Sequence, residues 1–171
     1  MTFMELAEAR YSVRKFSDKP VEKEKLDAVL EAARVAPTAH NFQPFRIYVL
    51  KSSEAIAKIR KLTPCAFNAP VVLMVTVAEE EQWTNDLEKG FAAGQVDVGI
   101  IGTHLMLEAA EQGLGSCWVA HFPPRSTAEA FGLSRHETPI MLLPLGYPAD
   151  GVVPSPSHAL RKSLGELVKE F

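Results

Sequence analysis

The segment from Gln95 to Gln112 constrains the fold most strongly, because it predicts a helix that is apolar around nearly its whole circumference. Its apolar side chains are those of Val96, Val98, Ile100, Ile101, Leu105, Met106, Leu107, Ala109 and Ala110. Such a helix has to be covered on nearly all sides. In a chain of 171 residues this is easiest when a second subunit covers one face, and Gly99 and Gly102 permit close approach. We therefore expect a homodimer with this helix buried at its centre.

The rest of the chain predicts a mixture of strands and helices. Val71–Ala78 reads VVLMVTVA, a nearly all-apolar run that is typical of a central strand covered on both faces. Alternation predicts another strand at Phe45–Val49. Further strands are expected at 116–120 and 139–146, and further helices near the N-terminus, over 21–35, and from Ser53, Ser126 and Ser163. Strands and helices do not alternate strictly, so the fold class is α+β or α/β.

One domain is expected over residues 1–171, since no internal repeat and no linker divides the chain. The net charge of −3 supplies no basic surface for a phosphate backbone, which argues against nucleic acid as a partner. No apolar stretch approaches the roughly 20 residues of a transmembrane helix, and the charged N-terminus does not read as a signal peptide. Cys65 and Cys117 lie far apart and outside any CxxC motif, which favours a reducing cytoplasm.

Several familiar sites can be excluded from the sequence. Gly113-Leu114-Gly115 opens a dinucleotide fingerprint, but Trp118 stands where the third glycine belongs. His136-Glu137 lacks the second histidine of a zinc-binding helix, and the five histidines are scattered. The sequence therefore predicts no metal site.

Three segments at element boundaries are rich in hydrogen-bond donors: Arg10–Arg14, Pro37–Pro44 and Arg161–Lys162. Arginine binds phosphate through two parallel hydrogen bonds, and a side-chain amide such as that of Asn41 can read a ring bearing acceptors and N–H donors. Together these segments suit a polyanionic, heteroaromatic ligand. Residues 79–95 are a polar excursion with one large aromatic side chain, and we expect a mobile lid there.

Five short motifs follow one another along almost the whole chain. R-x-S-V-R-x-F is present as Arg10–Phe16, and A-P-S-x-x-N-x-Q-P as Ala36–Pro44, with threonine in place of serine. Ala69-Pro70, Gly113–Trp118 and Leu145–Pro148 complete the set. In this order the motifs resemble those of the FMN-dependent nitroreductase family. The resemblance implies an α+β fold with a central mixed, mostly antiparallel β-sheet flanked by helices, in a homodimer with FMN sites at the interface.

The resemblance also implies which residues bind the cofactor. These are Arg10, Tyr11, Ser12, Arg14, Pro37, Thr38, Ala39, Asn41, Ala120, His121, Gly146 and Arg161. Arg10 and Ser12 are expected at the FMN phosphate and ribityl chain, and Arg161 or Lys162 at the same phosphate. Arg14 is expected near the N1/O2 edge of the flavin.

The other implied positions surround the flavin ring. The loop from Pro37 to Asn41 is expected to cover the cofactor of the other subunit. The backbone of Ala120 and His121 is expected to approach flavin N5, and Gly146 to let the chain pass close to the cofactor. His121 stands where family members often have a small residue, so it either crowds N5 or points away from it. Asn68 is expected to be a turn residue rather than a ligand.

The activity that the resemblance implies is NAD(P)H-dependent oxidation and reduction through FMN. NADH or NADPH gives hydride to flavin N5, leaves, and is replaced by an oxidant such as a nitroaromatic or a quinone. The flavin carries this chemistry, so no side chain is assigned as catalytic, and the Arg14 cation favours the anionic reduced flavin. Two alternatives stay open: another flavin reaction on the same fold, such as dehalogenation or flavin fragmentation, and FMN binding without turnover.

Overall fold

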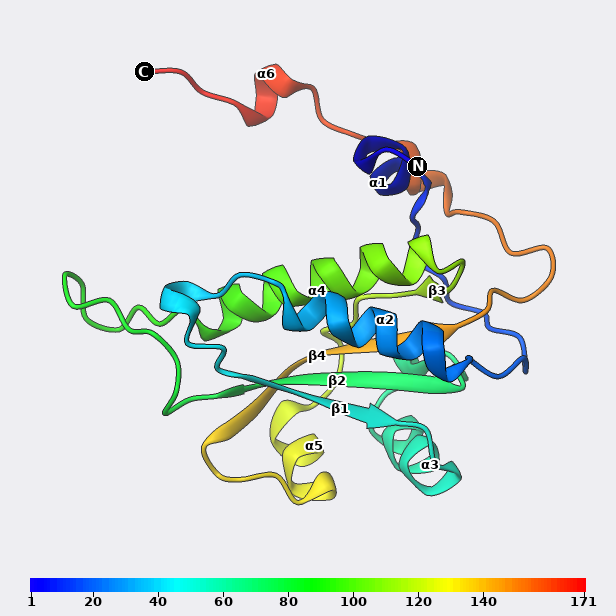
Figure 1. Cartoon of the computed structure of the whole chain (residues 1–171), viewed down its shortest axis with the longest axis horizontal. Helices are drawn as coiled ribbons and strands as arrows, with labels where there is room; N and C mark the ends of the chain where they lie inside the picture. Colours follow the sequence, from blue (N-terminus) through cyan, green and yellow to red (C-terminus); the bar gives the residue numbers. More distant parts are fainter.

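Four strands form one sheet in the spatial order β1-β2-β4-β3, and every pair is antiparallel (Figure 1). They are β1 (Phe45–Leu50), β2 (Val71–Ala78), β3 (Gly115–Ser116) and β4 (Glu137–Gly146), in a computed structural model that describes residues 1–171. The expectation of a mostly antiparallel sheet is confirmed. Its one parallel contact is an isolated bridge between Ser12 and Ser116.

Helices cover both faces of the sheet (Figure 1). On one face lie α2 (Lys23–Arg34) and α4 (Gly94–Glu111), and on the other lie α3 (Ser53–Leu62) and α5 (Pro124–Phe131). Side chains of β2 alternate between the two layers: Leu73 and Val75 join the core beneath α2 and α4, whereas Val72 and Met74 join the core beneath α3. This double burial accounts for the apolar sequence of β2. No helix is long and apolar enough to span a bilayer.

Within one chain, α4 is buried on one side only. Val98, Ile101 and Leu105 on its inner face are fully buried, whereas Val96 is 54% exposed. The exposed or half-buried residues on the opposite side, which we call the outer face of α4, are Val96, Gly99, Ile100, Thr103 and Leu107. A single chain therefore leaves open an apolar face of the helix that its sequence predicts to be buried all round.

The chain beyond β4 leaves the body of the protein. Its first part stays close to α1 (Phe3–Ala9): the Tyr11 hydroxyl donates to the Val152 carbonyl at 3.4 Å, and His158 Nε2 lies 3.0 Å from the Glu8 carbonyl oxygen. It ends in α6 (Leu164–Leu167), a single turn that lies away from the sheet (Figure 1). We call residues 160–171 the C-terminal arm, and its exposed apolar residues are Leu160, Leu164, Leu167, Val168 and Phe171.

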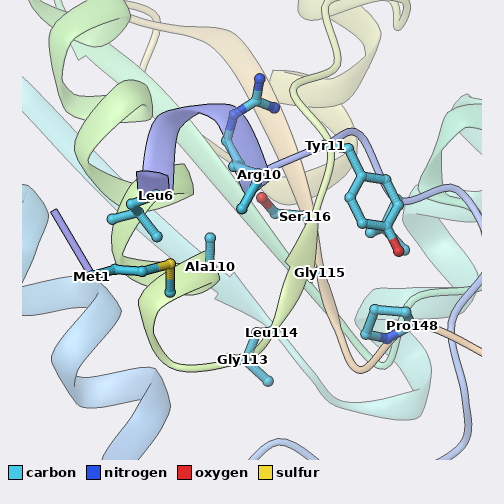
Figure 2. A pocket seen from close by; sticks show the side chains of 12 residues that line it. Met1, Leu6, Arg10, Tyr11, Ala110, Gly113, Leu114, Gly115, Ser116 and Pro148 are labelled. Atoms are coloured by element: carbon cyan, nitrogen blue, oxygen red, sulfur yellow. The ribbon is translucent and has the colours of Figure 1, made fainter. Parts of the chain in front are cut away.

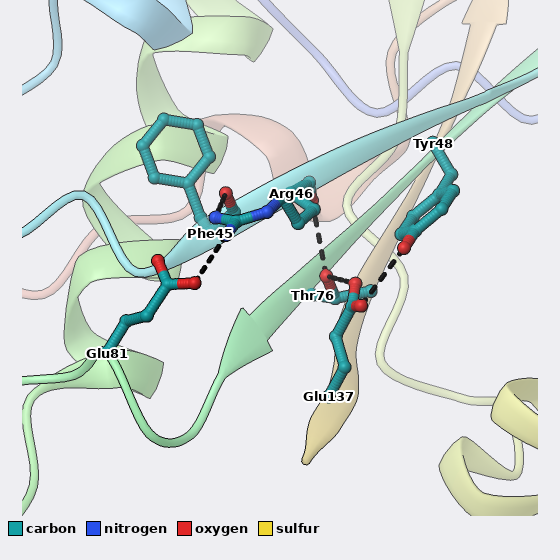
Figure 3. A network of polar contacts seen from close by, with 6 residues as sticks. All are labelled: Phe45, Arg46, Tyr48, Thr76, Glu81 and Glu137. Atoms are coloured by element: carbon teal, nitrogen blue, oxygen red, sulfur yellow. Dashed lines mark hydrogen bonds and ion pairs between the residues drawn. The ribbon is translucent and has the colours of Figure 1, made fainter. Parts of the chain in front are cut away.

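The expected excursion is present between β2 and α4, and its base is held at the strand ends (Figure 3). Arg46 of β1 forms an ion pair with Glu81, with 2.5 Å between Nη2 and Oε1. Glu137 at the start of β4 accepts a hydrogen bond from the Thr76 hydroxyl at 2.5 Å and another from the Tyr48 hydroxyl at 3.0 Å. The ion pair ties the excursion to β1, and the two hydrogen bonds to Glu137 join the three long strands to one another beside it.

The strand expected at 116–120 is shorter than its sequence suggests. β3 contains only Gly115 and Ser116, which pair with Gly146 and Leu145. The next pair is Cys117 and Pro144: the Cys117 N–H still donates to the Pro144 carbonyl at 3.3 Å, but Pro144 has no N–H to return, so the regular ladder ends there. Two residues further on, the chain meets β4 again at an isolated bridge, where Val119 and Leu142 exchange two backbone hydrogen bonds of 2.9 Å.

The expected start of α5 is also wrong by three residues, since the N-cap is Pro123 and not Ser126. The helix begins at Pro124, a residue whose missing N–H and fixed φ suit the first turn, so Ser126 lies inside the helix and does not cap it. At the chain end the expected capping box is confirmed, since Ser163 and Glu166 exchange hydrogen bonds at the start of α6.

Candidate functional site

The segment from Arg10 to Arg14 runs beside β3 at the edge of the sheet. The Val13 N–H donates to the Ser116 carbonyl at 2.9 Å, and the Val13 side chain is only 1% exposed. A Cβ atom at residue 115 would lie 2.6 Å from Val13 Cγ2, so glycine is required at that position. The turn at Gly113–Ser116 therefore supplies the surface on which the segment is fixed.

The cations of this segment are not neutralised by neighbouring acids. Arg34 and Arg46 form ion pairs with glutamates, but neither Arg10 nor Arg14 forms an ion pair or a side-chain hydrogen bond within the chain. Unpaired guanidinium groups on one short segment favour an anionic ligand with several acceptor oxygens.

The thiol of Cys117 lies among these groups. Burial raises the pKa of the Cys117 thiol, while the Arg14 guanidinium, the Ser12 hydroxyl and, more weakly, the Arg10 guanidinium act in the opposite direction. The sequence analysis assigned no role to Cys117. Its position shows that residues of the segment Arg10–Arg14 lie close to the end of β3.

A cleft opens beside this cationic segment. Its volume is about 340 Å³, which lies at the lower end of the range usual for ligand pockets, about 300–1,000 Å³. Ser12, Arg14 and Lys15 form one wall, and residues of the stretch 150–155 form the other. Lys15 and this stretch were not predicted as site residues.

A smaller, mainly apolar pocket of about 190 Å³ lies on the other side of the segment, between α1, the end of α4 and β3 (Figure 2). In Figure 2 the guanidinium group of Arg10 points away from Met1 and Gly113. Arg10 is nevertheless among the residues that line this pocket and does not line the cleft, whereas Ser12 and Arg14 do.

The second predicted group lies in the loop Pro37–Gln43, which we call the proline loop. Its backbone enters the left-handed region at three residues that are not glycine: φ is 52° at His40, 56° at Asn41 and 53° at Gln43. Asparagine and histidine adopt this conformation more readily than most residues, so the cost, roughly 1–2 kcal/mol, falls mainly on Gln43. The Thr38 hydroxyl accepts a hydrogen bond from the Gln43 N–H at 3.0 Å and so closes the loop. Strain of this kind is often maintained at functional sites.

The two groups lie at opposite ends of α4. The proline loop is joined to the N-terminal end of the helix, where the Ala39 N–H donates to Asp97 Oδ1 at 2.9 Å. The segment Arg10–Arg14 lies beside β3, just after the C-terminal end of the same helix. With 18 residues, α4 is about 27 Å long. One chain therefore does not bring the two predicted groups together.

Ala120 and His121 lie in an exposed stretch after the bridge at Val119. The Thr63 hydroxyl donates to the His121 carbonyl at 2.6 Å, which fixes this backbone. The structure also gives a reason within the chain for glycine at position 146, because a Cβ atom there would lie 2.7 Å from Pro70 Cδ.

Arg161 is the second residue of the C-terminal arm and is exposed. Its guanidinium group donates to the carbonyls of His158 and Leu160, and it does not line the cleft. Asn68 has a φ of 55° and forms, with Phe67, the turn before Pro70, in agreement with its expected role.

Asp97 is the most informative residue that the sequence analysis missed. It is the only acidic residue between Gln95 and Leu107 in an otherwise apolar helix, and it is 2% exposed. A lone carboxylate in such a helix is a signal that could have been read from the sequence.

A single antiparallel sheet between two helical layers, with unpaired cations at one edge, defines the class of protein: an α+β protein with a candidate anion-binding site at the β3 edge. A model of the nitroreductase family matches residues 7–67 and 62–147 of this chain. The chain therefore belongs to the nitroreductase family.

Individual proteins agree with this assignment. A protein of Methanothermobacter thermautotrophicus, named provisionally as an NADH dehydrogenase/NAD(P)H nitroreductase, is 30% identical and aligns over 88% of this chain and 79% of its own. The crystal structure of a nitroreductase family protein of Clostridium difficile matches with a TM-score of 0.92 and 38% identity, over 99% of this chain and 98% of that one. A protein of Exiguobacterium sibiricum, whose crystal structure contains FMN, has the same fold, with a TM-score of 0.84, 22% identity and coverage of 100% and 98%.

Proposed function

We propose that this protein is an FMN-dependent NAD(P)H oxidoreductase that reduces nitroaromatics, quinones or similar small oxidants. The observation that carries the proposal is the set of unpaired donors at the β3 edge, which occupies the position of the family's cofactor-binding motif. Family membership and the FMN-containing structure of similar fold support the choice of ligand.

The donors of the β3 edge fit FMN. Arg10 and Ser12 would hold the phosphate and ribityl chain, with Tyr11 beside them, because a guanidinium group and a hydroxyl offer the donors that a phosphate accepts. Arg14 would place a positive charge at the edge of the ring where negative charge accumulates on reduction. When bound, FMN supplies the hydride-accepting and hydride-donating chemistry of the reaction.

The site would be completed by a second copy of the chain. The outer face of α4 is apolar and open, and each end of α4 carries one half of the predicted site. A two-fold axis across this face would set two α4 helices antiparallel and so bring the proline loop of one subunit to the β3 edge of the other. Pro37, Thr38, Ala39 and Asn41 would then cover the partner's cofactor.

The C-terminal arm supports the same assembly. Its exposed apolar residues, among them Leu164 and Leu167, have no surface to pack against within the chain. In a dimer the arm could pack on the partner, and Arg161 or Lys162 would then reach a phosphate from a direction that the single chain does not allow. Ala120, His121 and Gly146 remain expected near the flavin ring.

Anaerobic visible spectroscopy tests the proposal. The purified protein is expected to show two flavin absorption bands, which bleach when NADH or NADPH is added and return when a quinone or nitroaromatic is added. Flavin bands that persist with both donors would indicate a binding protein without this activity. Protein that neither contains FMN nor binds it on addition would refute the proposal.

The identity of the oxidant can be resolved in the same assay. Re-oxidation by halogenated phenols, but not by nitroaromatics or quinones, would favour a dehalogenase on the same fold.

Cys65 and Cys117 form no disulfide, which fits the proposed reducing cytoplasm.

A further inference from the structure

Asp97 occupies an unusual place on the inner face of α4. Its neighbours Val98 and Ile101 are fully buried, and Asp97 itself is 2% exposed. Oδ1 accepts the hydrogen bond from the Ala39 N–H, whereas Oδ2 is buried without any hydrogen-bond partner. A buried carboxylate with an unpaired oxygen destabilises a fold relative to an apolar side chain of similar volume. The stability of α4 therefore does not explain this residue.

The location of Asp97 in α4 indicates which segment its carboxylate can bind. It belongs to the first turn of α4, where the helix dipole favours negative charge, and side chains of helical residues lean toward the N-terminus. The proline loop lies in that direction. Among the hydrogen bonds of the loop, the one from Ala39 to Asp97 is the only one to an element distant in sequence.

The proline loop needs such an anchor. Three residues that follow Ala39 adopt left-handed conformations, and the one at Gln43 is strained and persists only when its surroundings hold it. Ala39 lies between Thr38 and Asn41, two of the residues proposed to cover the cofactor of the partner subunit. Fixing the Ala39 amide therefore fixes the part of the loop that carries them.

We propose that Asp97 is a positioning residue for the flavin site. Its buried carboxylate holds the Ala39 amide, and through it the conformation in which the proline loop covers the cofactor across the dimer interface. This inference rests on the proposed function, since it names a residue that shapes the same site without touching the ligand.

Four variants of the full-length protein test the proposal. Asp97→Ala removes the acceptor, and Asp97→Asn keeps an acceptor oxygen of the same shape. Ala39→Pro removes the donor instead, at the first residue of a short 3-10 helix that follows an extended Thr38 (φ −132°, ψ 160°), where proline is tolerated. Thr127→Val is the matched control, because Thr127 is the other fully buried residue with an unpartnered oxygen, and it lies in α5.

Two measurements are compared across the variants: the Kd for FMN, from the quenching of flavin fluorescence, and hydrogen exchange of the peptide that covers residues 37–44. We expect Asp97→Ala and Ala39→Pro each to raise the Kd about tenfold, the effect of losing one hydrogen bond, and to speed exchange in this peptide. Asp97→Asn and Thr127→Val are expected to stay within about twofold of the wild type on both measurements.

Other results overturn the proposal. Unchanged hydrogen exchange and an unchanged Kd for FMN in both Asp97→Ala and Ala39→Pro would show that the hydrogen bond from Ala39 to Asp97 does not position the proline loop. Equal losses of FMN affinity in Asp97→Asn and Asp97→Ala would show that the acceptor oxygen is not the relevant feature of Asp97. An equal loss of FMN affinity in Thr127→Val would indicate general destabilisation. If Asp97→Ala does not fold, Ala39→Pro and Asp97→Asn decide the question.

The test also separates this inference from the proposed function. If the wild type binds no FMN, the proposed function fails, and the exchange measurement alone decides whether Asp97 anchors the loop. If the wild type binds FMN and no variant changes the Kd, the proposed function stands and the role of Asp97 is refuted.

Discussion

The imidazole ring of His40 stacks on the indole ring of Trp83, with ring centroids 5.6 Å apart and an angle of 9° between the planes. His40 belongs to the proline loop, and Trp83 belongs to the excursion, which spans residues 79–93 between β2 and α4. Within the excursion, Trp83 also packs edge-on against Phe91, with ring centroids 6.4 Å apart. The predicted lid is thus joined to the loop that we propose covers the cofactor.

Replacing His40 by alanine is expected to loosen the excursion. An aromatic stacking contact is worth about 1 kcal/mol, so the open population of the excursion should rise roughly fivefold. Limited trypsin digestion at Lys89, which is exposed within the excursion, measures this population. His158→Ala is the matched control, since His158 packs on Tyr11 far from the excursion. Equal digestion rates for His40→Ala and the wild type would contradict the coupling.

Arg10→Ala is expected to abolish the retention of FMN while leaving the fold intact. Arg10 has no ion pair to lose within the chain, so the melting temperature of the apoprotein should change little. A hydrogen bond to a charged group contributes about 1.5–3 kcal/mol, which corresponds to a loss of about 10- to 100-fold in affinity for FMN. Flavin content after gel filtration and the Kd for FMN measure the effect, with the exposed Arg60→Ala as control. Full flavin occupancy in Arg10→Ala would refute the phosphate assignment.

Gly115→Ala is expected to displace the segment that carries Arg10 and Ser12. The new Cβ would lie 2.6 Å from Val13 Cγ2 and force this segment away from β3, at a cost of about 1–3 kcal/mol in the free energy of unfolding. The double variant Val13→Ala with Gly115→Ala removes the clash and should recover part of both the stability and the FMN affinity. Urea unfolding and FMN titration provide the two readouts. Gly165→Ala, where nothing lies near the added Cβ, serves as control.

Periodicity and apolar runs predicted the parts of the fold that hydrophobic burial determines. Val71–Ala78 was predicted as a central strand with the observed bounds, because both of its faces lie in the core. The strand at 116–120 was predicted too long because its partner determines its end: Pro144 of β4 withholds the next N–H donor. Where a strand ends can depend on a residue of its partner strand. The sequence does not show which residue that is before the register of the two strands is known.

The candidate site, like the fold, could be predicted from the sequence only in its local parts. The segment Arg10–Arg14 and the proline loop could be predicted from short motifs, because their residue types are local. That the two lie at opposite ends of α4, and that Asp97 holds one of them, depends on how distant segments pack. Cys117, Lys15 and the stretch 150–155 were missed for this reason, since no local pattern links them to Ser12 or Arg14.

A charge on the outer face of α4 is expected to prevent the proposed dimer. Gly99 has no neighbour near an added Cβ within the chain, and glutamate favours helix more than glycine, so Gly99→Glu should not destabilise a single subunit. In a dimer the carboxylate would be buried against the partner. Sedimentation or light scattering is expected to show the wild type as a dimer and Gly99→Glu as a monomer that retains little FMN. Ser126→Glu, at an exposed position of α5, is the control. A dimeric Gly99→Glu protein with full FMN content would contradict an interface at this face.

The Tyr48 phenol is expected to make the protein less stable at high pH. Burial, together with the hydrogen bond to Glu137 and its negative charge, raises the pKa of Tyr48 above its ordinary value. The unfolded chain therefore loses this proton first as the pH rises, so the stabilising contribution is complete below about pH 10 and is lost as the pH passes through the higher pKa of the folded protein. Urea unfolding between pH 8 and 11 should show this loss in the wild type and in Tyr147→Phe, but not in Tyr48→Phe. At pH 8 Tyr48→Phe should itself cost about 1 kcal/mol, because Glu137 loses a donor. The same decline above pH 10 in Tyr48→Phe would show that another group is responsible.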